Sequence, residues 1–169
     1  MTVPHPDERA DLLPLLRAID AGADLASRAA VPGHVTCGTV VIDDLGRVLV
    51  LRHKTLNRWL LPGGHLEPAD TDLLAAALRE LHEETGIPER WIGGLPDMDA
   101  VPLDIDVHNI PADPAKGEPG HWHADFRYAF RVDSPEVRPQ LDEITDYRWR
   151  LPAELHTRWL TFKIEHLGA

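Results

Sequence analysis

The chain has 169 residues and a formal net charge of -11, because 28 acidic side chains outnumber 17 basic ones. This length suits one domain with its own core, and a hydrophobic content of 43% is typical of soluble globular proteins. The negative charge argues against a partner held through a long nucleic-acid backbone. No apolar run approaches the roughly 20 residues of a membrane helix, the start lacks a signal-peptide pattern, and there is one cysteine, so we expect a cytoplasmic protein without disulfides.

The first third of the chain predicts a helical arm followed by a β-hairpin. Leucines at helical spacing predict helix over residues 7–30, within an N-terminal arm of residues 1–33 that packs on a single domain, 1–169. β-Branched residues then predict strands at 35–42 and 47–53, joined by a turn that contains Asp and Gly.

The middle of the chain contains the clearest predicted helix, residues 71–85, which follows a loop at 57–70. Asp70 or Thr71 is expected to cap the start of this helix, and Gly86 marks its end. The remaining predicted elements are strands near 101–108, 123–132 and 144–149 and a closing helix near 152–167. Because strands and helices do not alternate regularly, we expect a mixed sheet with helices on its faces.

The predicted helix carries three glutamates on one face: Glu80, Glu83 and Glu84. Like charges at this spacing cost roughly 0.2–0.5 kcal/mol per pair, and Arg79 alone cannot offset three carboxylates. A bound divalent cation would offset their charge. Ligands that are oxygen atoms, with no cysteine among them, favour Mg²⁺ or Mn²⁺ over Zn²⁺. The alternative interpretation is a solvated acidic face that binds nothing.

A glycine pair gives this acidic helix a more specific meaning. Gly63 and Gly64 precede it, and residues 79–87 read Arg-Glu-Leu-His-Glu-Glu-Thr-Gly-Ile. The segment 63–87 resembles the Nudix box, the signature of the MutT-like Nudix hydrolases. It departs from the family pattern at Asp70, which stands in place of a glutamate and is separated from Arg79 by eight residues where the pattern has seven.

The resemblance implies a Nudix-type α/β/α sandwich with a mixed β-sheet, classed as α+β or α/β. It also implies Mg²⁺-dependent hydrolysis of the pyrophosphate bond in a nucleoside diphosphate linked to another moiety. By resemblance, Glu80, Glu83 and Glu84 hold the metal or include the general base, Arg79 orients them, and the Gly64 carbonyl is a further metal ligand. The expected partner is a small phosphorylated, nucleotide-like substrate, and the family also suggests a homodimer.

A second candidate segment lies on the strand predicted near 123–132. Alternation places His121, His123, Asp125 and Arg127 on one side of an extended strand. Two histidines beside an aspartate are typical of a metal site, but they also suit a polar sheet face with local hydrogen bonds. A third interpretation is that His123 and Asp125 line the active site, with His108 as a further candidate.

Phosphate binding requires cations, and a nucleotide base often stacks on an aromatic ring. Arg52 and Arg58 flank the loop before the glycines, and Arg127 lies on the later strand; guanidinium groups bind phosphate in bidentate fashion. Trp59 is a candidate for base stacking. We therefore predict substrate contacts from these four residues and from His123 and Asp125; the alternatives are surface charge and core packing.

Two other functions are compatible with the same fold. One is a catalytically silent Nudix-fold module that binds or senses a nucleotide, which usually shows gaps in the box. The other is an isomerase of diphosphate esters, which often needs a cysteine in the site; Cys37 lies on an early predicted strand without an acidic partner nearby in sequence.

Overall fold

A mixed β-sheet forms the centre of the computed structural model, which describes residues 8–94, 100–132, 137–155 and 157–167. Eight described strands take part: β3-β2-β1-β7-β5 in order, with β4 paired to β1, β6 to β7 and β8 to β2. The strands are β1 (Gly33–Ile42), β2 (Val48–His53), β3 (Arg58–Leu60), β4 (Gly63–His65), β5 (Ile92–Gly94), β6 (Asp104–Ile110), β7 (His121–Val132) and β8 (Ile144–Arg150). β1 and β7 run parallel and the other pairs are antiparallel, which confirms the expected mixed sheet.

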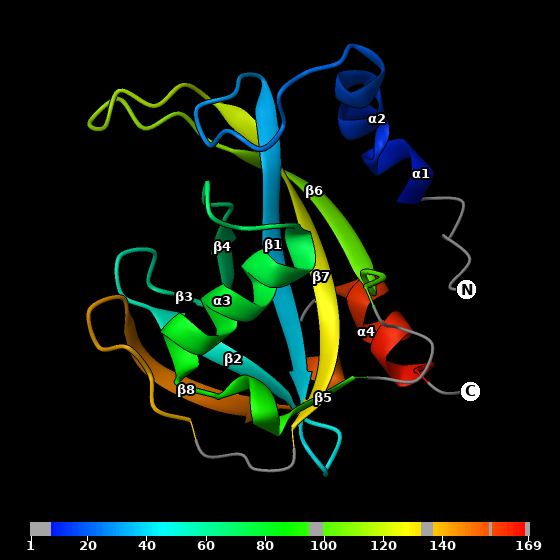
Figure 1. The fold of residues 1–169 in the computed structure, drawn as a ribbon, viewed down its shortest axis with the longest axis vertical. Helices are drawn as coiled ribbons and strands as arrows, with labels where there is room; N and C mark the ends of the chain where they lie inside the picture. The colour runs from blue at the N-terminus through cyan, green and yellow to red at the C-terminus, as the bar shows by residue number, and fades with distance from the viewer. Residues whose placement is uncertain (1–7, 95–99, 133–136, 156, 168–169) are drawn as a thin grey trace.

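Helices cover both faces of this sheet (Figure 1). The helices are α1 (Glu8–Asp11), α2 (Leu13–Asp20), α3 (Leu73–Thr85) and α4 (Arg158–Glu165), with short 3-10 turns at Glu89–Trp91 and Pro152–Glu154. Leu81 of α3 packs in one core cluster with Leu49, whereas Leu160 of α4 packs in another with Val48. Because Val48 and Leu49 point to opposite faces of β2, the two helices lie on opposite sides, and the expected α/β/α layering is confirmed. None of the described helices has the length and apolarity needed to span a membrane.

The N-terminal arm is less helical than predicted. Helix ends at Asp20, so the expectation of helix over residues 21–30 is wrong, and residue 7 lies outside the described residues. Gly22 adopts a left-handed conformation with φ 67°, and the Val35 amide donates to the Leu25 carbonyl. The chain has to reverse here so that β1 enters the sheet, and a continuous helix would prevent this.

The loop predicted at residues 57–70 contains two short strands, β3 and β4. Each has three residues, which is too short for an alternating pattern to be recognised. β4 pairs with the middle of β1, with Cys37 opposite Gly64 and Gly38 opposite Gly63. The glycine pair is therefore fixed against a strand whose residues are all buried. The closing helix is also shorter than expected, because α4 starts only at Arg158.

Candidate active site

The helix α3 is positioned by its two ends and its apolar face. Its N-cap is Asp72, whose Oδ1 accepts a hydrogen bond from the Ala75 amide at 2.8 Å, so the expected cap at Asp70 or Thr71 is wrong. Gly86 ends the helix in a left-handed conformation, as predicted, with φ 66°. Leu81 is fully buried in the core, which turns the glutamate face toward β4.

Two of the three glutamates lie directly against the glycine pair. Glu84 is 9% exposed, and its Oε2 accepts a hydrogen bond from the Gly63 amide at 2.9 Å. Glu80 occupies the space beside Gly64, because a Cβ atom on that glycine would fall 2.5 Å from Glu80 Oε1. The absent side chain at residue 64 therefore makes room for a carboxylate. Glu83 is more open, with 49% of its side chain exposed.

Arg79 connects these carboxylates to the loop before the helix. Its Nη1 donates to Glu80 and to Glu83, both at 3.1 Å, and its Nη2 donates to the His65 carbonyl at 2.9 Å. Its Nε and Nη2 also hold both carboxylate oxygens of Asp70, at 3.0 and 2.9 Å. These hydrogen bonds lower the pKa of Asp70. Arg79 thus orients two glutamates, and Asp70 anchors Arg79.

The electrostatics of the glutamate face fit a divalent cation. Burial, together with the nearby charges of Glu80 and Glu143, raises the pKa of Glu84 to about 8. Burial also raises the pKa of Glu80, against the opposing effect of Arg79. Negative charge at these carboxylates is therefore unfavourable without a cation, and their oxygen atoms are the ligands that Mg²⁺ and Mn²⁺ prefer. Glu143 was not recognised in the sequence because it lies far from the box and only tertiary folding brings it near.

The Gly64 carbonyl is close to this face and is contacted by Cys37. The Cys37 thiol donates to the Gly64 oxygen, with 3.5 Å between sulfur and oxygen. Burial raises the pKa of this thiol to about 12, and its side chain is 1% exposed. Cys37 is therefore a protonated hydrogen-bond donor at neutral pH, which gives no support to the isomerase alternative.

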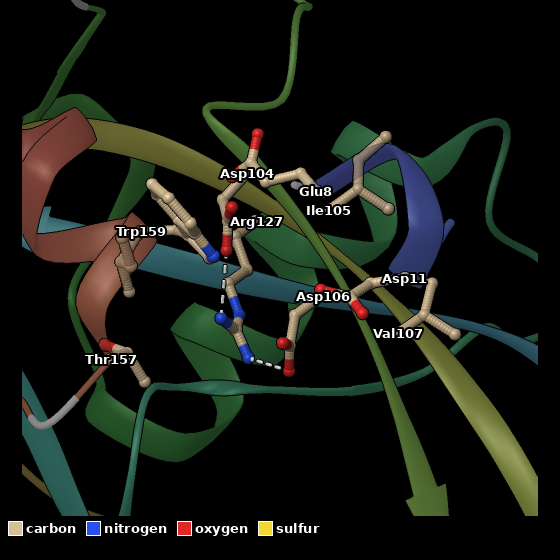
Figure 2. A pocket seen from close by; sticks show the side chains of 10 residues that line it. Glu8, Asp11, Asp104, Ile105, Asp106, Val107, Arg127, Thr157 and Trp159 are labelled. Carbon is tan, nitrogen blue, oxygen red and sulfur yellow. Dashed lines mark hydrogen bonds and ion pairs between the residues drawn. The ribbon is translucent and has the colours of Figure 1, made fainter. Parts of the chain in front are cut away.

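The predicted substrate residues of β7 are bound to other protein groups. Arg127 is 11% exposed in its side chain and forms ion pairs with Asp104 and Asp106 at 3.0 and 2.8 Å (Figure 2). It forms a third ion pair with Asp125 at 2.9 Å. Asp125 also accepts a hydrogen bond from the Thr36 hydroxyl at 3.2 Å. Arg127 borders a cavity of about 160 Å³ whose lining includes four acidic side chains, those of Glu8, Asp11, Asp104 and Asp106. A phosphate contact from Arg127 would have to compete with three aspartates.

Three arginine side chains surround the ring of Trp59 on β3. The guanidinium carbon of Arg52 lies 5.6 Å from the centre of the Trp59 ring, and those of Arg148 and Arg150 lie at 4.7 and 5.1 Å. Arg148 and Arg150 are two residues apart on β8, which pairs with β2, so their side chains point to the same side of the sheet. In the sequence, this spacing is the only signal that the two arginines act together. Arg58 is exposed at the start of β3. The structure thus brings Arg52 and Trp59 together, on strands other than β7.

His123, one of the residues expected to line the active site, lies among other histidines. Its ring is near those of His34, His65 and His121, with ring centres 4.5, 5.3 and 5.0 Å away. His34 and His65 come from β1 and β4. The sequence offered no signal for either, because His34 belongs to no motif and the resemblance gives no role to His65 within the segment 63–87. This group lies at one end of the sheet and is considered separately below.

Replacing Arg79 with lysine is expected to lower kcat by about 10–100-fold and to change KM less than threefold, because Arg79 positions carboxylates rather than substrate. Lysine keeps the charge but cannot hold Asp70 and two glutamates at once. Steady-state kinetics of Arg79→Lys beside Arg90→Lys, a surface control, would measure this. A loss confined to KM would instead place Arg79 in substrate binding.

Comparisons with known proteins converge on one family. The model of the NUDIX domain matches residues 32–167. A "Probable DHNTP pyrophosphohydrolase" of Lactococcus lactis subsp. cremoris is 33% identical over 91 residues, which is 54% of this chain and 50% of that protein. An RNA pyrophosphohydrolase of Dinoroseobacter shibae is 28% identical, over 80% of this chain and 87% of its own length. Among solved structures, an Ap4A hydrolase of C. elegans aligns with a TM-score of 0.58 at 18% identity, covering 78% of this chain and 94% of that one.

Proposed function

Because the chain belongs to the Nudix family, we propose that it hydrolyses the pyrophosphate bond of a nucleoside diphosphate linked to another moiety, with Mg²⁺ or Mn²⁺. The observation that carries this proposal is the intact carboxylate face of Glu80, Glu83 and Glu84, held over Gly63 and Gly64. The match to the Lactococcus relative spans only half of that relative's length, so the reaction is inferred from the site. The acidic surface and the buried single cysteine support a small substrate and a cytoplasmic location, and a homodimer is our expectation for the assembly.

In this proposal, Glu80, Glu83 and Glu84 hold the cation, and one of them accepts the proton of the attacking water. A cation held there would offset phosphate charge and lower the pKa of water. The Gly63 amide fixes one oxygen of Glu84, which leaves the other free for a ligand, and Arg79 fixes Glu80. The Gly64 carbonyl supplies a further oxygen. Substrate contacts are proposed for Arg52, Arg58 and Trp59. The same proposal for His123, Asp125 and Arg127 on β7 requires a substrate that also reaches the opposite side of the sheet, where Arg127 is paired with three aspartates.

A substrate panel with Mg²⁺ tests this function. ADP-ribose, NADH, nucleotide sugars and dinucleoside polyphosphates resist alkaline phosphatase until they are cleaved, so excess phosphatase would report their hydrolysis. Ordinary and oxidised nucleoside triphosphates and a 5′-triphosphorylated oligoribonucleotide would be followed with inorganic pyrophosphatase. We expect selective turnover that falls to background after chelation with EDTA and returns with Mg²⁺.

The control is the Glu84→Gln protein prepared in the same way, which reveals contaminating phosphatases. Turnover that survives chelation, or equal turnover in the control, would contradict the proposal. Ligand-induced stabilisation without any turnover would favour the silent binding module.

A further inference from the structure

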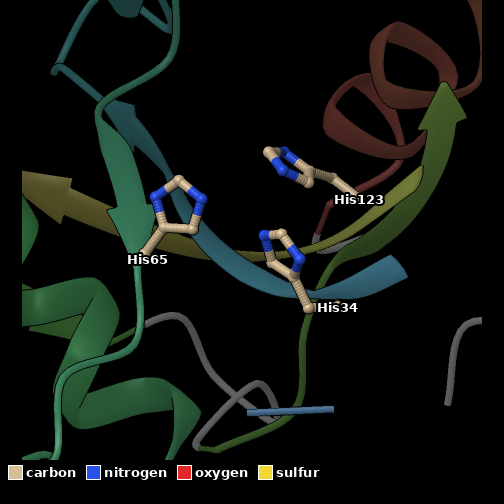
Figure 3. Close-up of side chains that lie close together, drawn as sticks. All are labelled: His34, His65 and His123. Carbon is tan, nitrogen blue, oxygen red and sulfur yellow. The ribbon is translucent and has the colours of Figure 1, made fainter. Parts of the chain in front are cut away.

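Three histidine rings from three strands converge at one end of the sheet. His34 lies on β1, His65 on β4 and His123 on β7, and one potential ligand nitrogen from each lies within 4.8 Å of the others (Figure 3). In the described part of the chain, this is the one such group of three potential metal ligands. The register explains the convergence, because His34 is opposite His123 and His65 is opposite Thr36 on the same side of the sheet.

The His34 ring is the member that most needs a partner. It is 1% exposed, and neither of its ring nitrogens forms a hydrogen bond with a described residue. The nearby Ala30 backbone raises the pKa of this ring against the larger opposite effect of burial. Buried polar atoms are normally satisfied, so an unpaired imidazole that points toward two others indicates a ligand between them.

Two of the rings have the protonation state that metal binding requires. Burial lowers the pKa of His34, and that of His123 to about 3, and the neighbouring imidazoles add to the effect. At neutral pH each of these two rings is uncharged, with a nitrogen lone pair available for coordination. A proton shared between two of the rings is therefore not needed to explain why they lie so close together.

His121 extends the group from the edge of β7. Its Nδ1 lies 2.9 Å from the Pro119 carbonyl, and its Nε2 lies 3.1 Å from His123 Nε2. A carbonyl only accepts, so Nδ1 carries a hydrogen, and Nε2 is the ring nitrogen that faces the group. A backbone carbonyl behind the ring is a common arrangement for a metal-binding histidine.

We propose that His34, His65 and His123 form a binding site for a transition-metal ion of the Zn²⁺ class, with His121 placed to supply a fourth nitrogen. Zinc–nitrogen bonds are about 2.0–2.1 Å, so tetrahedral ligand atoms lie about 3.3 Å apart, and small rotations of the side chains close the remaining gap. Neutral imidazoles select Zn²⁺ and its transition-metal neighbours over Mg²⁺, which prefers oxygen.

This site is separate from the glutamate face. A side chain on Gly64 would point toward Glu80, on the α3 side of the sheet. The side chain of the next residue, His65, points to the other side, because successive residues of a strand alternate. Two ions of different chemistry therefore have different ligands on opposite faces of β4. The inference does not depend on the proposed hydrolase activity.

Metal binding by protein without a polyhistidine tag tests the proposal. After removal of metal with chelators, Zn²⁺ would be titrated in competition with a chromophoric chelator, and Co²⁺ would be added as a spectroscopic probe. We expect one Zn²⁺ per chain with a Kd below about 1 µM and a visible Co²⁺ spectrum of tetrahedral type. Absence of tight Zn²⁺ binding, or an octahedral Co²⁺ spectrum, would overturn the proposal without any variant.

Variants then identify the ligands. His65→Asn, His123→Asn and the ring-preserving His34→Phe are each expected to weaken Zn²⁺ binding by more than about 100-fold. Glu84→Gln and His166→Asn, which lie outside the group, are expected to leave binding within about twofold. Circular dichroism would verify the fold of each variant.

Two outcomes would contradict this assignment. Loss of Zn²⁺ in Glu84→Gln with retention in the histidine variants would place the ion at the glutamates. If His34→Phe raises the Tm of metal-free protein and Zn²⁺ leaves the Tm of the wild type unchanged, the group is a packing of uncharged rings. Failure of the hydrolase assay alone would leave these binding results as they are.

Discussion

Glutamine at position 84 is expected to lower kcat by at least about 10³-fold while the protein stays folded. Glu84 contributes a carboxylate at the centre of the proposed metal site, and the neutral amide of glutamine cannot replace its charge. The Gly63 amide can still donate to the glutamine side-chain oxygen, so the local structure should persist. Turnover would be measured with the substrate identified by the panel, and a rate within tenfold of wild type would contradict the role of Glu84.

The same variant should stabilise the metal-free protein at alkaline pH. The pKa of Glu84 is raised from its ordinary value of 4.5 to about 8, mainly by burial. Between these values the folded state binds a proton that the unfolded state does not, so stability falls as pH rises through this window. One pKa unit corresponds to about 1.4 kcal/mol, so removing the charge should add at least about 1 kcal/mol at pH 8, or about 2–4 °C in Tm.

Thermal unfolding from pH 5 to 8.5 in the presence of EDTA would show the difference. The pH-dependent decline of Tm should be shallower in Glu84→Gln than in wild type. Glu89→Gln, at an exposed position, is the control and should follow the wild-type curve. Parallel curves for wild type and Glu84→Gln would contradict the prediction, because they would show that ionising Glu84 does not lower the stability of the folded protein.

Alanine at position 63 is expected to destabilise the fold by about 2–4 kcal/mol. A Cβ atom there would lie 2.3 Å from the Cys37 carbonyl oxygen and 2.7 Å from Gly38 Cα, and φ at this position is +155°. Both contacts are with the backbone of β1, whose residues are all buried and have no room to move. The shift would also displace the amide that holds Glu84, so activity should fall together with stability.

Alanine at position 64 provides the matched comparison. The nearest atoms to its Cβ would be those of the flexible Glu80 carboxylate, the closest at 2.5 Å, and this carboxylate can rotate away. Gly64→Ala should therefore keep a Tm near that of wild type and lose most of its activity, because Glu80 is displaced. Denaturant unfolding and kcat of the two variants would separate these effects. Equal stability of Gly63→Ala and wild type would contradict the close contact with β1.

Local patterns in the sequence were sufficient for the acidic helix and its family. Helical spacing, the capping glycine and the short motif that ends at Ile87 all lie within one continuous segment, so they could be recognised without a structure. The mixed sheet also followed from the order of strands and helices. Even here, the sequence alone could not show that the N-cap is Asp72 rather than Asp70 or Thr71, because Asp and Thr side chains can all cap a helix.

Three features required the tertiary structure, because each combines residues distant along the chain. Asp70 proved to be the anchor of Arg79, a contact across nine positions that depends on how the loop folds back. Arg127 was expected to be available to phosphate, yet β6 supplies two aspartates that bind it. Short strands such as β4 are invisible to periodicity, and they determine which side chains meet.

The sequence by itself therefore determined the family, the type of fold and the glutamate face, since these depend on short-range spacing. The tertiary structure alone decided how that face is held and which histidines come together. His34, His65 and His123 are separated by 31 and 58 positions in the chain, and their proximity results from the pairing of β1 with β4 and β7. Strand pairing is set by the packing of the whole sheet, so no local pattern could have predicted it.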